Sequence, residues 1–184
     1  MFLGQNGLNI KIKTFDISGN SFKVIYSPHH SAVISLTYLL ITKALPSEVF
    51  TMVNVKTLHA AKCNIQKINE FQVFDKLTTL NLEHNDIEEG VISGFHPVLV
   101  KLNLSYNHMK IFPVSLTNLV NLQELSLNSN RLTDIKGIEC LVSIVSLELD
   151  DNLLTELIID WKQLSQVLTH SLTHSLTHSL TLLN

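Results

Sequence analysis

Apolar and polar residues alternate along several short stretches of this chain, and each stretch is followed by a conspicuous polar residue. The segment LVKLNLSYNHM places Leu102 and Leu104 on one face and Lys101 and Asn103 on the other. Alternation with a period of two is typical of a short β-strand that buries one face. Asn107 follows soon after the last leucine of this stretch. The pattern predicts a half-buried strand followed by a turn.

The same pattern recurs along the chain, with apolar residues at the first, fourth and sixth positions of every copy. The copies begin at Ile12, Val55, Leu77, Leu99, Leu122 and Ile144. The residue that ends each pattern is an asparagine in all copies but one: Asn20, Cys63, Asn85, Asn107, Asn130 and Asn152. From Cys63 onward its spacing is 22, 22, 23 and 22 residues. Such regularity indicates a repeat array, in which each unit packs against its neighbours.

The repeat resembles the leucine-rich repeat family, L-x-x-L-x-L-x-x-N/C-x-L, over about residues 12–157. The resemblance implies an α/β solenoid. Its expected shape is a horseshoe with a parallel β-sheet on the concave side and short helices, 3-10 turns or loops on the convex side. The repeats are similar to the intracellular type, as a mixture of the Ras-suppressor and phosphatase-regulator kinds.

The asparagines are expected to satisfy the backbone of the turns that follow the strands. Buried N–H and C=O groups almost always find a hydrogen-bond partner. One asparagine amide supplies two donors and an acceptor, so a column of such residues can bond to successive turns. A thiol bonds only weakly, which predicts a looser repeat at Cys63. The alternative is that these asparagines are ordinary turn residues.

The segments between the strands differ from one another. Residues 46–54 and 113–121 begin with proline and carry apolar residues three or four apart. This pattern favours a short helix or helical turn opened by proline. Residues 134–143 contain a glycine and β-branched residues instead, which favours a tighter convex segment.

We expect a lead-in at residues 1–11, an array of six to seven repeats at 12–165 and a tail at 166–184. Residues 26–44 are interpreted as a degenerate repeat. Their longest apolar run is about half of the ~20 residues that a membrane-spanning helix needs, so no membrane span is expected.

The tail repeats the tetrapeptide LTHS. Wound as a helix, it would align His170, His174 and His178 one turn apart, a spacing that suits zinc or nickel. Serine and threonine form helices poorly, so a low-complexity extension without metal is the favoured interpretation.

Composition narrows the function classes. The chain has 184 residues, 45% of them hydrophobic, and a net charge of −3, which is consistent with one folded domain. Its basic residues are scattered, so no nucleic-acid partner is expected. The sequence has no phosphate-binding loop, nucleophile elbow or zinc-protease motif, so neither catalysis nor a cofactor is expected.

The expected location is the cytoplasm, with the nucleus as a further compartment. The N-terminal residues lack a basic leader followed by an apolar core. Cys63 and Cys140 lie more than three repeats apart and are not expected to meet. The cysteine-rich caps that extracellular members of the family usually carry are missing from the sequence.

Alternation also predicts which strand residues face outward on the concave side. The candidate protein-binding residues are His59, Glu83, Lys101, Asn103, Glu124, Ser126, Glu148 and Asp150. Four acids against one lysine make this face acidic, which favours a protein partner with a basic patch. The alternative is a merely solvated sheet face.

Two functions follow from this sequence. The first is a non-catalytic protein–protein interaction module, acting as an intracellular scaffold or regulatory subunit. The alternative is the recognition segment of a larger signalling enzyme, such as a kinase, phosphatase or ubiquitin ligase.

Overall fold

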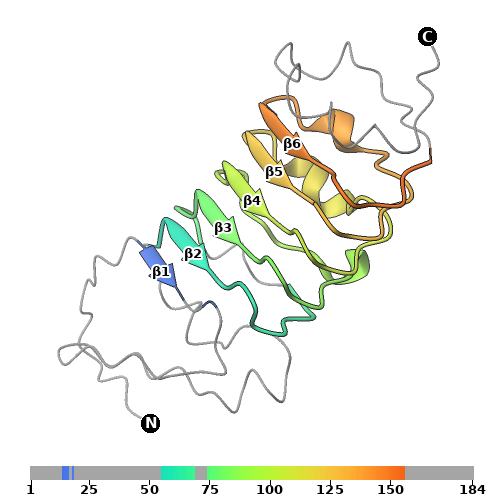
Figure 1. Ribbon diagram of the computed structural model, residues 1–184. Coiled ribbons are helices and arrows are strands. Elements are labelled where there is room, and N and C mark those ends of the chain that lie inside the picture. Colours follow the sequence, from blue (N-terminus) through green and yellow to red (C-terminus); the bar gives the residue numbers. More distant parts are fainter. Residues whose placement is uncertain (1–13, 17, 19–54, 69–73, 156–184) are drawn as a thin grey trace, which may run out of the picture.

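The computed structural model describes residues 14–16, 18, 55–68 and 74–155 (Figure 1). These residues form a six-stranded sheet whose strands follow one another in sequence order. All neighbouring strands are parallel. The strands are β1 (Thr14–Asp16), β2 (Thr57–His59), β3 (Thr79–Asn81), β4 (Lys101–Asn103), β5 (Glu124–Ser126) and β6 (Ser146–Glu148).

Each strand is three residues long, and its central position is apolar. The central leucines of β2 to β6 lie in register across the sheet. They are Leu58, Leu80, Leu102, Leu125 and Leu147, and all are buried. The residues before and after each of them are partly or fully exposed. The predicted period-two alternation is therefore confirmed, with one face of the sheet buried and the other in solvent.

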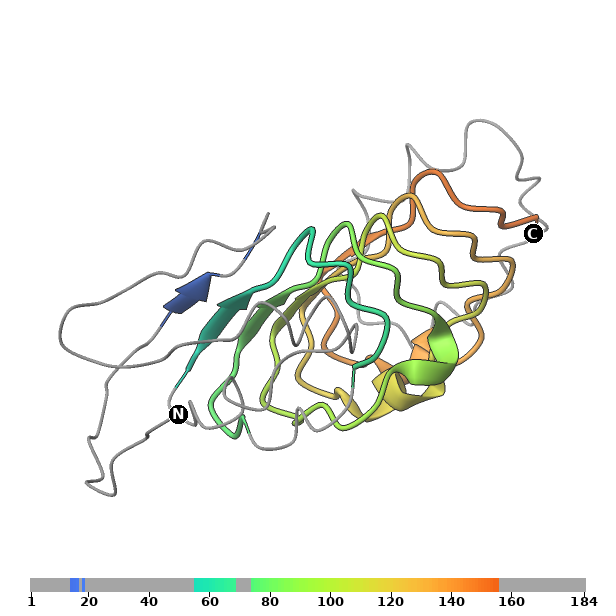
Figure 2. The same cartoon turned by 90° about the horizontal axis from the view of Figure 1, so that it is seen from below.

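Among the described residues, three short 3-10 helices lie on the opposite side from the sheet (Figure 2). They are η3 (Glu89–Val91), η4 (Val114–Asn118) and η5 (Ile138–Cys140). Pro113 immediately precedes η4, with φ of −69°. Proline restricts φ to this range and has no N–H to leave unpaired, which suits a helix start. The helical turn expected within 113–121 is therefore present as a 3-10 helix.

The core fills the space between the sheet and these helices. A second apolar position in each repeat, two residues after the central leucine, is also buried, as at Leu82, Leu104, Leu127 and Leu149. These side chains belong to a single hydrophobic cluster that runs along the array. A single strand cannot bury its apolar face by itself, so each repeat forms the core together with its neighbours. The horseshoe solenoid expected from the sequence is the observed fold.

Some sequence predictions concern segments outside the described residues. These are the lead-in 1–11, Asn20, the degenerate repeat 26–44, the helix 46–54 and the tail 166–184. The domain boundaries remain predictions. In the part of the chain that is described, no helix has the length and apolar character needed to cross a membrane.

Candidate functional site

One position in each repeat, four residues after the strand, is called the ladder position here. The ladder asparagines that occupy it bond to the backbone of two repeats: Asn85, Asn107, Asn130 and Asn152. Asn107 accepts the Ile87 N–H at its Oδ1, over 3.0 Å. Its Nδ2 donates to the carbonyl oxygens of Leu82 and Leu104, over 3.1 and 3.0 Å. Asn85, Asn130 and Asn152 repeat this arrangement in their own repeats. Each amide therefore connects one turn to the preceding one and holds the edge of the sheet in place.

Cys63 occupies the same place in its repeat with different bonding. Its Sγ lies 3.3 Å from the Ala61 carbonyl oxygen, to which it donates. The Cys63 N–H donates to Oδ1 of Asn85 over 3.0 Å, so the next asparagine secures this turn from its own side.

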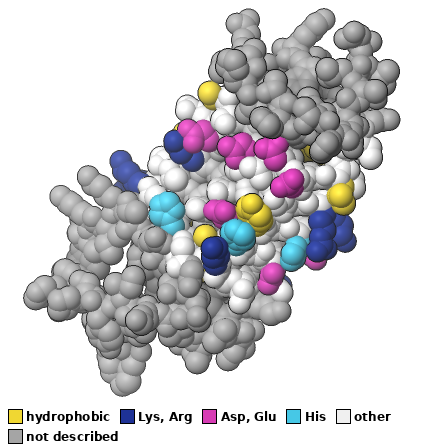
Figure 3. All heavy atoms as spheres, viewed as in Figure 1, with side chains coloured by type: hydrophobic (Ala, Val, Ile, Leu, Met, Phe, Trp, Pro, Cys, Tyr) yellow, Lys and Arg dark blue, Asp and Glu magenta, His cyan; other side chains and the backbone are white. Residues whose placement is uncertain are grey.

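The eight candidate binding residues project from the solvent face of the sheet or from the loops directly after it. Lys101, Glu124 and Glu148 are exposed. The others are partly buried: His59, Glu83, Asn103, Ser126 and Asp150. Figure 3 shows acidic side chains lying side by side on this face toward the end where β6 lies, next to a basic side chain.

Two of the candidate residues form an ion pair with each other. Nζ of Lys101 lies 2.7 Å from Oε1 of Glu124. The pair joins β4 to β5, where these residues are in register. Both side chains are about half exposed, so the pair contributes little to stability. It does offset the charge of Glu124, and the net negative charge of the face therefore rests on the other three acids.

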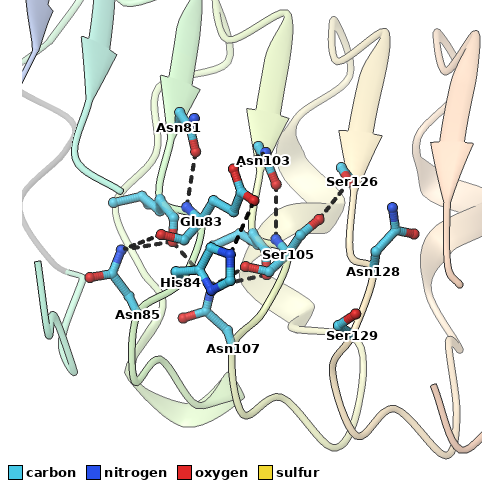
Figure 4. A network of polar contacts seen from close by, with 12 residues as sticks. Asn81, Glu83, His84, Asn85, Asn103, Ser105, Asn107, Ser126, Asn128 and Ser129 are labelled. Carbon is cyan, nitrogen blue, oxygen red and sulfur yellow. Dashed lines mark hydrogen bonds and ion pairs between the residues drawn. The ribbon is translucent and has the colours of Figure 1, made fainter. Parts of the chain in front are cut away.

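The Glu148 carboxylate is held in a fixed position by its neighbours on β5 and the following loop. Its Oε2 accepts the Ser126 hydroxyl over 2.7 Å and the Asn128 amide over 3.0 Å. The hydroxyls of Ser126 and Ser105 are 2.6 Å apart and continue the network toward β4 (Figure 4). Oδ1 of Asn128 also accepts the Asp150 N–H, over 2.8 Å. Glu148 and Asp150 thus lie together on an ordered polar surface.

Glu83 lies in the repeat of β3, three repeats before Glu148. Its Oε2 accepts the Asn103 amide over 3.5 Å, and its Oε1 lies 3.5 Å from Nε2 of His84. Figure 4 shows Glu83 and His84 beside each other at the end of β3. The three predicted acids other than Glu124 therefore lie at two places on the face, and the Lys101–Glu124 pair lies between them.

Sequence reasoning did not identify His84 and Tyr106 as surface features. Their rings are stacked, with centroids 4.1 Å apart and planes 13° from parallel. Both residues immediately precede a ladder asparagine and have positive φ, 53° and 56°. The two residues occupy the same position in successive repeats, and this spacing could have predicted that they are neighbours.

Among the described residues, no group of three or more histidine, cysteine, aspartate or glutamate side chains could hold a metal ion. Cys140 is an exposed free thiol. The arrangement on the solvent face is a polar, partly charged surface rather than a pocket lined with reactive groups, and its chemistry suits recognition of another molecule.

The family model described as Leucine Rich Repeat matches residues 76–97 and 121–141. The chain is 27% identical to Toll-like receptor 10 from Bos taurus over 146 residues, which are 78% of this chain and 18% of the receptor. It is 33% identical to volume-regulated anion channel subunit LRRC8A from Rattus norvegicus over 88 residues, 46% of this chain and 11% of the subunit. The chain therefore spans less than a fifth of the length of these relatives.

A crystal structure of a TLR13–ssRNA13 complex is similar in fold, with a TM-score of 0.52 and 28% sequence identity. The similarity covers 60% of this chain and 17% of that chain. Together with the repeat spacing and the parallel sheet, these matches identify the chain as a leucine-rich repeat protein. Domains of this family commonly mediate protein–protein interactions.

Proposed function

We propose that this chain is a non-catalytic protein-binding module, which acts as a scaffold or regulatory subunit and binds a protein with a basic patch. The observation that supports it best is the ordered acidic surface of Glu148 and Asp150. The Glu148 carboxylate accepts bonds from Ser126 and Asn128, so it loses little freedom when a cation approaches. A negative surface also steers a positively charged partner during encounter.

The candidate contact residues of this proposal are those of the solvent face, with different roles. Glu148, Asp150 and Glu83 supply the negative charge. Lys101 and Glu124 neutralise each other over 2.7 Å and mark the middle of the surface. The remaining candidates, His59, Asn103 and Ser126, supply hydrogen-bonding groups at the rim.

The test uses the full chain and removes two charges without changing side-chain shape. The binding variant is Glu148→Gln with Asp150→Asn. The matched control is Glu88→Gln with Glu139→Gln, which removes the same charge next to and within the 3-10 helices. Each protein is immobilised and exposed to the same cell extract, after circular dichroism has confirmed folding.

We expect the unaltered chain and the control to capture at least one protein in equal amounts. The binding variant should capture about tenfold less of it, since paired charges at an interface contribute strongly to affinity. Retention should fall as salt is raised, because screening weakens the attraction. Equal capture by both variants would place the binding surface elsewhere on the array.

We further propose that the protein acts in the cytoplasm or nucleus. The support is that Cys140 is an exposed free thiol, a state that reducing compartments maintain. Fluorescence microscopy of the chain tagged at either end tests this directly. A signal in the secretory pathway or the medium would contradict it.

A second candidate is that the array is the recognition segment of a larger protein, such as a signalling enzyme. The lengths of the relatives favour it, since the matched regions are only 18% of Toll-like receptor 10 and 11% of LRRC8A. Sequencing full-length transcripts distinguishes the two candidates. An open reading frame that continues into a catalytic domain supports the second.

A further inference from the structure

In each repeat from β2 to β6, the residue directly before the ladder position is held in the left-handed backbone region. These residues form a column along the edge of the sheet, and their φ angles lie between 52° and 58°. The column consists of Lys62, His84, Tyr106, Ser129 and Asp151. Four of the five are exposed, and Ser129 is partly buried. For an aromatic residue such as Tyr106 this conformation is unusual.

The backbone of the column is fixed by hydrogen bonds to the next repeat. The N–H of His84 donates to the Ser105 carbonyl over 3.0 Å, and that of Tyr106 donates to the Asn128 carbonyl over 2.8 Å. These side chains are therefore presented from a rigid edge. A partner that binds them does not have to order a loop first, which lowers the entropic cost of binding.

The two rings in this column stack on one another, so each covers one face of its neighbour. The centroid separation of 4.1 Å and the angle of 13° describe a nearly parallel pair. His84 lies in the repeat of β3, so the second ring face of Tyr106 is directed toward the repeat of β5. The column residue there is Ser129, whose side chain is small. Tyr106 is 46% exposed, which leaves ring surface available to a flat group.

The charges around the stack favour a cation. Glu83 lies 3.5 Å from the His84 ring nitrogen, and a second carboxylate, Asp86, lies 3.4 Å from Nε2 of His108. Asp151 follows Ser129 in the column, and its Oδ2 accepts the Ser129 hydroxyl over 3.3 Å.

The basic side chains of the same edge are Lys62, in the column beyond His84, and Arg131, which follows the ladder residue Asn130. Three carboxylates against these two cations leave this edge net negative, and a phosphate backbone would be repelled. A guanidinium group combines positive charge with a flat surface that stacks on aromatic rings.

We propose that the His84–Tyr106 stack is a docking point for an arginine side chain of a protein partner, with the guanidinium lying on the free face of the Tyr106 ring. The proposal deepens the proposed function and rests on it, because it specifies the chemistry of one contact on a protein partner. The proposed interaction surface then includes both the acidic face and the edge of the sheet at which the strands end.

The test titrates the full chain with a capped peptide, acetyl-Gly-Arg-Gly-amide, and follows ring signals by NMR. Two further ligands are titrated separately for comparison. One is the same peptide with lysine in place of arginine, and the other is an oligouridylate of thirteen nucleotides. Tyr106→Asn removes the ring while retaining a residue that tolerates the left-handed conformation. Tyr106→Phe keeps the ring and serves as the matched control, and amide spectra verify that both variants fold.

We expect the arginine peptide to shift the Tyr106 and His84 ring signals at millimolar concentration. The affinity read from the His84 signal should fall about fivefold in Tyr106→Asn and remain unchanged in Tyr106→Phe, as a stacked cation on a partly exposed ring predicts. The lysine peptide should bind more weakly than the arginine peptide.

Equal shifts in Tyr106→Asn and the unaltered chain would overturn the proposal, as would ring shifts caused by the oligouridylate and not by the arginine peptide. The peptide measurement needs no cellular partner. It can therefore fail while capture through Glu148 and Asp150 succeeds, and it can succeed when that capture fails, so the two proposals are tested separately.

Discussion

The ladder asparagines use their side-chain amides to hydrogen-bond the backbone of two neighbouring repeats. In Asn107, one amide oxygen and one amide nitrogen reach the main chain of its own repeat and of the preceding one. The residue is 3% exposed, so water cannot replace these bonds. Losing the Asn107 side chain leaves the buried Ile87 N–H without its partner and takes one of two amide donors from each of the Leu82 and Leu104 carbonyls. An unpaired buried donor costs more than its bond contributed.

We therefore expect Asn107→Ala to lower the free energy of unfolding by about 3 kcal/mol, as measured by urea denaturation. Asn118→Ala is the control, since Asn118 is exposed at the end of η4 and should change stability by less than about 0.5 kcal/mol. Equal effects of the two substitutions would show that the ladder bonds contribute nothing beyond those of an ordinary turn residue.

At the scale of the element, a few backbone positions determine the conformation of the convex segments. The glycine and β-branched residues of 134–143 predict a tight convex segment, and η5 begins directly after Gly137. Gly137 has φ of 100°, which side chains rarely tolerate. A Cβ at this position would lie 3.3 Å from Cγ2 of Thr117, so the glycine also allows η4 and η5 to approach.

Gly137→Ala should therefore lower the free energy of unfolding by about 1–2 kcal/mol, from backbone strain and the contact with Thr117. Gly90 is the matched control, because it lies within η3 and a Cβ there meets no atom within 4 Å. Gly90→Ala should leave stability unchanged or raise it slightly, by about 0.5 kcal/mol. Thermal denaturation followed by circular dichroism distinguishes the two. A larger loss in Gly90→Ala than in Gly137→Ala would contradict this account.

At the scale of the whole molecule, one core runs through the described repeats and each repeat contacts mainly its neighbours. The N–H of Leu82 donates to the Asn103 carbonyl, and that of Leu104 to the Ser126 carbonyl, both over 2.8 Å. Every repeat is thus bonded and packed to the next. A destabilising substitution in the middle of such an array therefore weakens the interfaces with both neighbouring repeats.

Leu104→Ala should accordingly destabilise the fold by about 3 kcal/mol, since Leu104 is completely buried. Hydrogen exchange should accelerate at the amides of both Leu82 and Leu127, which lie in the flanking repeats. Val114→Ala serves as the control, because Val114 is 75% exposed and its loss should change little. Faster exchange confined to the repeat of β4 would contradict a shared core.

The sequence alone determined the array, its parallel sheet and the positions of the buried leucines. Burial alternates strictly along a strand, so Leu102 and Leu104 must share a face wherever the repeat is placed in space. The spacing of 22 or 23 residues then brings equivalent positions into register, as in the pairing of Leu102 with Leu125. Backbone periodicity carries this information, and no contact between distant side chains is needed to read it.

Only the tertiary structure decided how the side chains on the solvent face combine. The sequence placed Lys101 and Glu124 on one face but could not show that they pair, because rotamers and distances between repeats are set by packing. The hydrogen bonds that hold Glu148 and the stack of His84 on Tyr106 have the same origin. The sequence therefore determined where the surface lies, whereas the packed array determined which of its groups remain available to a partner.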